Sequence, residues 1–274
     1  MTASTLSHAD FVRTDLARAD ISHAIFDFDG TLSWLRHGWP SLMLKTFLNH
    51  TPAHWSNDAD LCSELLSEIL SLNGKPSIHQ LARCAERART AGVNTPDAQT
   101  LLKEYLPLMR EIVNERIAVI RSGERSADEF VVWNARRALE NLRERGVTLI
   151  ILSGTAEPDV RAEAQVLGLT PFFGNHIYGS PVQGSFSKKD VIDRIMREEK
   201  IEGHHLLSFG DGPVEIQSTK AVGGLAIGVA SDEEVNGSHE IDSAKKKQLV
   251  AAGADVIVPD YAEVDALLGM IFPA

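Results

Sequence analysis

The 274-residue sequence contains only two cysteines, Cys62 and Cys84, and both lie in segments with helical periodicity. Their positions indicate neither a disulfide framework nor a cysteine metal site, which favours a reduced compartment. The first 19 residues lack the apolar stretch of a signal peptide, and no apolar run approaches the length of a membrane span. We therefore expect a cytoplasmic protein without a membrane partner.

Long basic runs are also missing. Lys and Arg together number 27 against 38 Asp and Glu, which gives a formal net charge of −11. Nucleic acid and anionic membrane surfaces are therefore excluded as the main partner. The short run Lys245-Lys246-Lys247 is interpreted as the solvated face of a helix. An acidic protein of this kind binds a phosphorylated metabolite only where it supplies a local cation.

No internal repeat or low-complexity tract interrupts the chain, and its apolar content is sufficient for a substantial core. Short apolar runs alternate with helical patterns, which predicts an α/β fold with a doubly wound parallel sheet. The expected strands are 23–26, 147–152, 176–178, 206–209, 225–229 and 255–258. In such sheets ligands bind at the carboxyl ends of the strands.

One long region, residues 32–125, has helical periodicity and no convincing strand. It is interpreted as an inserted all-helical domain, and residues 1–31 and 126–274 as the core. Expected helices cover 39–50, 61–72 and 77–91, and a fourth opens at Thr95-Pro96 and is kinked or broken at Pro107. Residues 1–20 are expected to be frayed or partly helical. The capping-box pattern Ser126 to Glu129 predicts a helix that ends at Gly146.

The first strand ends in an unusual pair of acids. Asp27 and Asp29 are two residues apart, so they share one face if the strand continues, and Gly30 permits a sharp turn after them. A buried strand gains nothing from adjacent unpaired acids, which suits either a bound cation or an acid–base pair. In phosphoryl transfer, one Asp can attack phosphorus while the other protonates the leaving oxygen.

Polar residues also follow two further strands. Ser153 and Gly154 follow the second strand, where backbone N–H groups at a helix start could hold phosphate oxygens, and Asp211 follows the fourth strand. Asp27, Asp211 and a backbone carbonyl offer the oxygen ligands that Mg²⁺ prefers. Lys188 and Lys189 are both candidates for the cation that holds the phosphate.

Taken in order, these motifs resemble those of the haloacid dehalogenase-like hydrolases. The matching segments are Asp27 to Thr31, Leu152 to Thr155, Lys188 with the apolar pair Val191-Ile192, and Gly210 to Glu215. The resemblance covers the predicted core, and the helical insert resembles a cap of the family's first type. It implies a Rossmann-like core whose cap closes over a small substrate.

The resemblance also implies roles for individual residues. Asp27 would be the nucleophile and a Mg²⁺ ligand, and Asp29 the general acid/base that binds the metal through its backbone carbonyl. Thr31, Ser153, Gly154 and Lys188 would surround the phosphoryl group, and Asp211 would bind Mg²⁺. Glu215 stands where many members have Asp, so either direct ligation or binding through water remains open.

An acid at position 29 is typical of the phosphatase and phosphomutase branches. The resemblance therefore implies a Mg²⁺-dependent phosphatase that hydrolyses a small phosphomonoester, such as a sugar phosphate, through an aspartyl-phosphate. A sugar-phosphate mutase and a non-catalytic phosphometabolite-binding protein are the alternatives. Arg36 is a candidate for contacting the leaving group, whereas His204 and His205 lie at the far end of the fourth strand and are interpreted as structural.

Overall fold

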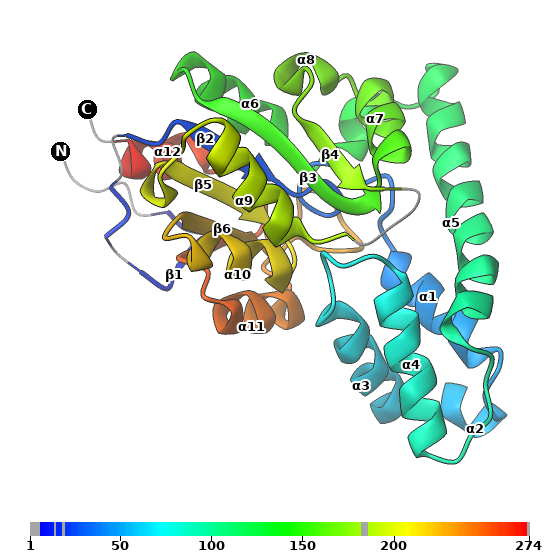
Figure 1. Ribbon diagram of the computed structural model, residues 1–274. Helices are drawn as coiled ribbons and strands as arrows, with labels where there is room; N and C mark the ends of the chain where they lie inside the picture. Colours follow the sequence, from blue (N-terminus) through cyan, green and yellow to red (C-terminus); the bar gives the residue numbers. More distant parts are fainter. Residues whose placement is uncertain (1–5, 14, 18–19, 182–185, 273–274) are drawn as a thin grey trace.

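The computed structural model describes residues 6–13, 15–17, 20–181 and 186–272, which form an α/β core with a helical lobe beside it (Figure 1). The core sheet has the strand order β1-β7-β6-β5-β2-β3-β4. Neighbouring strands are parallel except for β1, which pairs antiparallel with β7 at one edge. The strands are β1 (Asp10–Phe11), β2 (His23–Phe26), β3 (Thr148–Ala156), β4 (Ile177–Ser180), β5 (Leu206–Gly210), β6 (Leu225–Val229) and β7 (Val256–Val258).

The central strand β2 carries the first acidic motif. It pairs with β3 on one side and with β5 on the other, with His23 opposite both Thr148 and Leu206. The chain therefore builds the sheet outward from β2 in both directions, and this switch in strand order opens a crevice at the carboxyl ends of the strands. The predicted doubly wound α/β fold is confirmed.

Both faces of the sheet are buried, because successive residues of a strand point to opposite sides. Phe26 stacks on Phe209 on one face, with ring centroids 4.7 Å apart, while Ile25 packs against α9 residues on the other. The first face is covered by α6 (Ala135–Glu144), α7 (Glu157–Val166), α8 (Thr170–Phe173) and α12 (Val264–Ile271). The second is covered by α9 (Lys188–Glu198), α10 (Pro213–Ala221) and α11 (Ser243–Ala252).

The helical lobe follows β2 in the chain and has a hydrophobic cluster of its own, from Met43 to Val113. Its helices are α1 (Trp39–Leu48), α2 (Ala53–Ser56), α3 (Ala59–Leu70), α4 (Ile78–Thr90) and α5 (Ala98–Arg121). Helix α5 leaves the lobe and packs against α7 of the core (Figure 1). The predicted helical insert is therefore present, while its exact limits at 32 and 125 stay a prediction. None of the helices in the described ranges is long and apolar enough to cross a membrane.

Helix α5 differs from the prediction in two details. The helix is capped by Asp97, whose side chain accepts from the N–H of Thr100 at 2.8 Å, rather than by Thr95. It also continues unbroken past Pro107, which lies on its exposed side. A proline removes only one helical N–H, and the buried side chains on either side of it hold the remaining turns in place.

Two other segments differ from expectation. The capping box at Ser126 opens only a short 3₁₀ helix, η1 (Ala127–Phe130), and α6 starts later because Val131 forms a β-bridge with Ser33. In the lead-in, Asp10 and Phe11 form β1 rather than helix or frayed chain. Residues 1–5, 14, 18 and 19, to which the same expectation applied, lie outside the described part.

Candidate active site

Asp27 lies directly after β2, at the carboxyl edge of the sheet. Its backbone N–H still bonds to the carbonyl of Phe209 in β5, at 2.9 Å, so the position is fixed by the sheet. Three residues later Gly30 has a φ of 74°, and a Cβ there would collide with the carboxylate of Asp211. The turn therefore requires glycine both for its backbone conformation and for this close approach.

An acidic cluster forms where β2 and β5 end. One carboxylate oxygen each of Asp27, Asp211 and Glu215 lies within 4.8 Å of the others, and all three residues are buried. Neither carboxylate oxygen of Asp211 accepts a hydrogen bond from any described residue. Burial raises the pKa of Asp211 well above its usual value, although the ammonium of Lys245 opposes this shift. A cation ligated by these oxygens would compensate the buried charge.

Lys188 is one of the cations that reach this cluster. Its Nζ lies 2.8 Å from Oδ1 of Asp27 and 3.1 Å from Oε2 of Glu215, and its side chain is fully buried. Burial opposes the charge on Lys188, but the two carboxylates outweigh it and raise the pKa of the ammonium. Lys189 points to solvent and pairs with Asp193 instead. Of the two lysines left open by the sequence, only Lys188 contacts Asp27.

Glu215 is held at the first turn of α10. Its Oε1 accepts from the backbone N–H of Gly212 at 2.7 Å, while its Oε2 contacts Lys188. Burial raises the pKa of Glu215 to about 7 against the opposing effect of Lys188. Both oxygens are thus engaged within the protein, although the carboxylate remains close enough to Asp27 and Asp211 to share a metal ion with them.

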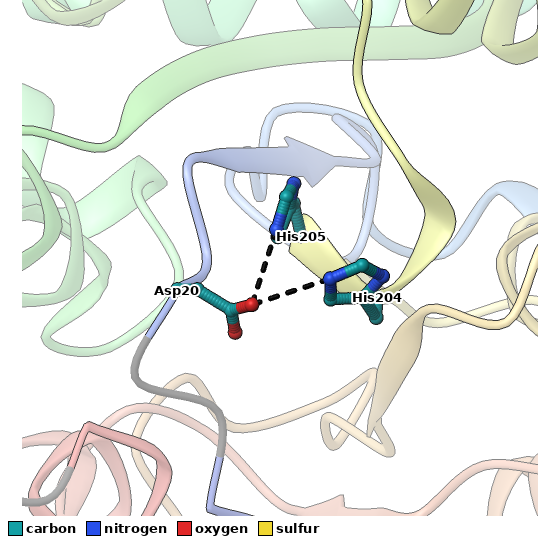
Figure 2. A group of neighbouring side chains, drawn as sticks. All are labelled: Asp20, His204 and His205. Carbon is teal, nitrogen blue, oxygen red and sulfur yellow. Dashed lines mark ion pairs between the residues drawn. The ribbon is translucent and has the colours of Figure 1, made fainter.

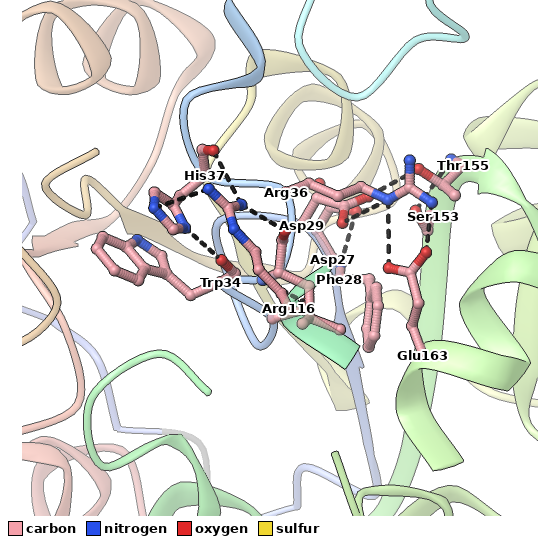
Figure 3. A network of polar contacts seen from close by, with 12 residues as sticks. Asp27, Phe28, Asp29, Trp34, Arg36, His37, Arg116, Ser153, Thr155 and Glu163 are labelled. Carbon is pink, nitrogen blue, oxygen red and sulfur yellow. Dashed lines mark hydrogen bonds and ion pairs between the residues drawn. The ribbon is translucent and has the colours of Figure 1, made fainter. Parts of the chain in front are cut away.

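Asp29 belongs to a second polar network (Figure 3). The hydroxyl of Thr155 donates to its Oδ2 at 2.7 Å, and Nε of Arg36 lies 3.5 Å from its Oδ1. Arg36 also forms a close ion pair with Glu163 of α7. Burial raises the pKa of Asp29, whereas Arg36 and Thr155 lower it. Burial likewise raises the pKa of Glu163, to about 7.

Arg36 both lines the cavity described below and forms ion pairs with two carboxylates of the core, while its expected contact with the leaving group stays a prediction. Its neighbour His37 is stacked on Trp34, with ring centroids 3.9 Å apart, and contacts Arg116 of α5 (Figure 3). These residues tie the start of the helical lobe to the core, and sequence reasoning did not identify Glu163 or Arg116.

Ser153 and Gly154 differ from expectation in their local structure. The strand β3 continues to Ala156, so Ser153 lies inside a strand and not at a helix start; α7 begins only at Glu157. The pairing of β3 with β4 shifts its register between Leu152 and Ala156, and this irregularity turns Ser153 and Gly154 toward the cavity. The hydroxyl of Ser153 accepts from the N–H of Thr155 at 3.0 Å.

Thr31 lies apart from the cavity. Its side chain is fully buried, it does not line the cavity, and its hydroxyl has no hydrogen-bond partner among the described residues. Its backbone N–H bonds to the carbonyl of Phe28 within the turn that follows Asp27. The structure thus places Thr31 within the turn, and its expected contact with the phosphoryl group stays a prediction.

Lys245 was wrongly expected at a solvated helix face. It is 2 % exposed, and its Nζ lies 3.4 Å from Oδ2 of Asp211 and 2.5 Å from Oε1 of Glu233. It also donates to the hydroxyl of Ser231, which donates in turn to the carbonyl of Gly30. A helical signal was present, because Lys245 and the buried Leu249 are four residues apart and share a face of α11.

A cavity of about 470 Å³ opens between the core and the helical lobe. Asp27, Asp29 and Ser153 line it from the core, and Lys75, Gln80, Tyr105 and Arg110 line it from the lobe. The loop before α4 lies directly over the acidic cluster: a Cβ on Gly74 would be 2.6 Å from Glu215 Oε2, and one on Gly154 would be 3.1 Å from the carbonyl oxygen of Gly74. The volume suits one small molecule.

The fold and site together define a capped α/β protein with an acidic cleft at the carboxyl edge of its sheet. The chain belongs to the haloacid dehalogenase-like hydrolases: that family's model matches residues 21–223. This match spans β2, the helical lobe and the strands up to β5, so the resemblance drawn from the motifs is confirmed.

Solved structures show the same fold at low sequence identity. A "predicted phosphoglycolate phosphatase" from Haemophilus somnus 129pt has a TM-score of 0.60 and 16% identity, with 91% of this chain and 98% of that one covered. A HAD family hydrolase from Deinococcus radiodurans R1 was solved with bound phosphate and sodium. It has a TM-score of 0.57 and 17% identity, with 93% of this chain and 100% of that one covered. A "putative beta-phosphoglucomutase" from Thermotoga maritima has a TM-score of 0.52 and 16% identity, with 87% of this chain and 94% of that one covered. No curated protein matches significantly in sequence.

Proposed function

We propose that this protein is a Mg²⁺-dependent phosphatase that hydrolyses a small phosphomonoester through an aspartyl-phosphate on Asp27. The observation that carries the proposal is the position of Asp27 in the acidic cluster, with Lys188 2.8 Å away and a cavity in front of it. A nucleophilic carboxylate needs cations beside it to approach an anionic phosphate. Family membership supports a phosphatase-type enzyme.

The residues of the cluster fit Mg²⁺. They offer only oxygen donors, and the buried carboxylate of Asp211 has no hydrogen-bond donor among the described residues. When ionised, the carboxylates of Asp27, Asp211, Glu215 and Glu233 outweigh the two buried ammonium groups, Lys188 and Lys245, by two charges. One divalent cation would neutralise this excess. Asp27, Asp211, Glu215 and the carbonyl of Asp29 would hold it, and it would reduce the repulsion between carboxylate and phosphate.

The side chains then divide the reaction into two steps. An oxygen of Asp27 attacks phosphorus, the phosphorus–oxygen bond to the leaving group breaks, and Asp29 donates a proton to that oxygen. In the second step Asp29 removes a proton from water as the water oxygen attacks phosphorus, which frees Asp27 and releases inorganic phosphate. Lys188, Ser153 and the Gly154 backbone would hold the phosphoryl oxygens. The raised pKa of Asp29 supports its role as the proton donor.

Polar groups at the wall of the cavity support a hydroxylated leaving group, such as that of a sugar phosphate. Gln80 is 2% exposed, and its Nε2 donates to the carbonyl of Leu72, yet its Oε1 has no hydrogen-bond partner in the described part of the chain. Asn73 lines the same cavity and leaves its Nδ2 unpartnered there. A substrate hydroxyl could satisfy both the free acceptor and the free donor.

The test is phosphate release from a panel of phosphorylated metabolites, with Mg²⁺ and with EDTA. The proposal expects metal-dependent release from a narrow group of substrates. A sugar-phosphate mutase, the activity named for the Thermotoga maritima neighbour, would instead need a bisphosphate activator and release little phosphate. Tight binding of a phosphorylated metabolite with no turnover of any kind would indicate a non-catalytic binding protein.

A further inference from the structure

A second group of potential metal ligands lies at the opposite, amino-terminal edge of the sheet (Figure 2). Oδ2 of Asp20 lies 3.1 Å from Nε2 of His205 and 3.3 Å from Nε2 of His204. All three side chains are accessible, with 53%, 49% and 30% of Asp20, His204 and His205 exposed. From this convergence we propose that the three residues form a Zn²⁺ site separate from the catalytic cluster.

The sheet fixes the positions of these ligands. Ser22, just before β2, donates its N–H to the carbonyl of His205, just before β5, at 3.0 Å. Since β2 and β5 are adjacent and parallel, Asp20 is brought beside the two histidines. The histidines would point to opposite sides in a strand, but they lie in the 3₁₀ turn η2 (Gly203–His205). Their rings are therefore neighbours, with centroids 4.0 Å apart.

The two separations from Asp20 to the histidines agree with tetrahedral zinc. Bonds of about 2.0–2.1 Å from zinc to nitrogen and oxygen place neighbouring ligand atoms of a tetrahedron about 3.3–3.4 Å apart. The two separations between Asp20 and the histidines, 3.1 and 3.3 Å, are within a few tenths of an ångström of that value. A water molecule would complete the coordination, since the site is open to solvent. Two imidazole ligands favour Zn²⁺ over Mg²⁺, which prefers oxygen.

A second carboxylate supports the site from outside. Oε2 of Glu202 lies 3.5 Å from Nδ1 of His204, the ring nitrogen that faces away from Asp20. A carboxylate beside Nδ1 favours the tautomer with the proton on that nitrogen and leaves Nε2 free to bind a metal, an arrangement common behind zinc-bound histidines. Asp20 and Glu202 also bring two negative charges to the same small surface. A bound ion would link the segment before β2 to the start of β5.

The test is calorimetric titration of the full, untagged chain with Zn²⁺ in excess Mg²⁺, so that Mg²⁺ occupies the oxygen-rich catalytic cluster. We expect one saturable Zn²⁺ equivalent, with affinity at least tenfold weaker in His204→Ala and in Asp20→Asn. His50→Ala is the matched control, because His50 forms a single histidine–carboxylate pair with Glu104, at 2.7 Å, elsewhere in the chain. This control should leave zinc binding unchanged.

Thermal unfolding gives an independent measurement. Zn²⁺ should raise the Tm of the wild-type chain and of His50→Ala, and should not raise that of His204→Ala. Half of the His204 side chain is exposed, so this variant should keep the wild-type Tm without metal. Absence of saturable binding, or equal zinc affinity in wild type and His204→Ala, would overturn the proposal. Neither result depends on phosphatase activity.

Discussion

Thr155 donates its hydroxyl proton to Oδ2 of Asp29 at 2.7 Å, across 126 positions of sequence. This hydrogen bond favours the ionised carboxylate and lowers the pKa of Asp29, against the stronger upward effect of burial. If Asp29 protonates the leaving group, this bond, together with burial and Arg36, contributes to the pH above which the acid is lost.

Thr155→Val should therefore raise the pKa of Asp29 further, and the alkaline limb of kcat/KM should move upward by about one pH unit. Thr155→Ser keeps the hydroxyl and should keep the limb in place. The measurement is a pH profile of kcat/KM for all three proteins. A limb that stays in place in Thr155→Val, or moves to lower pH, would argue against Asp29 as the proton donor.

Lys188 and Lys189 provide a comparison between adjacent lysines. Lys188→Met removes the cation between Asp27 and Glu215 and should lower turnover at least a hundredfold. It should also lower the free energy of unfolding by about 3–5 kcal/mol, because two buried carboxylates lose their partner. Lys189→Met should leave both turnover and denaturant midpoint unchanged, since that side chain faces solvent. Near-normal turnover in Lys188→Met would contradict the proposed role of Lys188 in holding the phosphoryl group.

Lys245 is expected to balance charge behind Asp211. In Lys245→Met, Asp211 and Glu233 lose a buried cation, so the apo protein should be destabilised by about 3 kcal/mol or more. Mg²⁺ should restore more stability to this variant than to the wild type, because the ion replaces the missing charge. The measurement is Tm with and without Mg²⁺, with Lys246→Met as the control, since Lys246 pairs with Asp10 away from the site. Equal Mg²⁺-induced shifts in variant and wild type would contradict this account.

Gly74 holds the lobe loop against the acidic cluster. It has a φ of 85°, and a Cβ there would lie 2.6 Å from Oε2 of Glu215. Gly74→Ala should displace the loop over the cavity and raise KM at least tenfold. Gly92→Ala places a Cβ on a similar backbone, with a φ of 73°, where nothing lies within 4 Å. Gly92→Ala should therefore carry the same backbone strain as Gly74→Ala but leave KM unchanged. Equal KM values in the two variants would show that the loop at Gly74 does not contribute to substrate binding.

The central strands could be predicted because they are buried on both faces and form dense apolar runs. The run Leu225 to Val229 matches β6 at both ends, and the run from His23 gives β2. The edge strand β1 was missed because two residues, Asp10 and Phe11, carry no periodic signal. Ser153 was placed after its strand because Gly154 resembles a terminator, whereas the register shift against β4 lets β3 continue.

The position of the candidate site could be predicted from the two acids that follow β2, because a buried strand gains nothing from adjacent unpaired acids. Its supporting charges were not predicted, because their role depends on contacts distant in sequence. Lys245 looks like a surface lysine until Glu233 and Asp211 surround it, and Glu163 looks like a helix-surface acid until Arg36 pairs with it. Lys245, Glu233 and Asp211 come together when the core folds, whereas Arg36 and Glu163 meet only where the start of the lobe packs against the core.

The most direct test of the central claim is acid quenching during turnover with a substrate from the panel, followed by mass spectrometry of the peptide that contains Asp27. The account predicts one added phosphoryl group on Asp27 in the wild type, and no label and no turnover in Asp27→Asn with its fold intact. Turnover that persists in Asp27→Asn, or a wild-type phosphoryl group found on another residue, would contradict it.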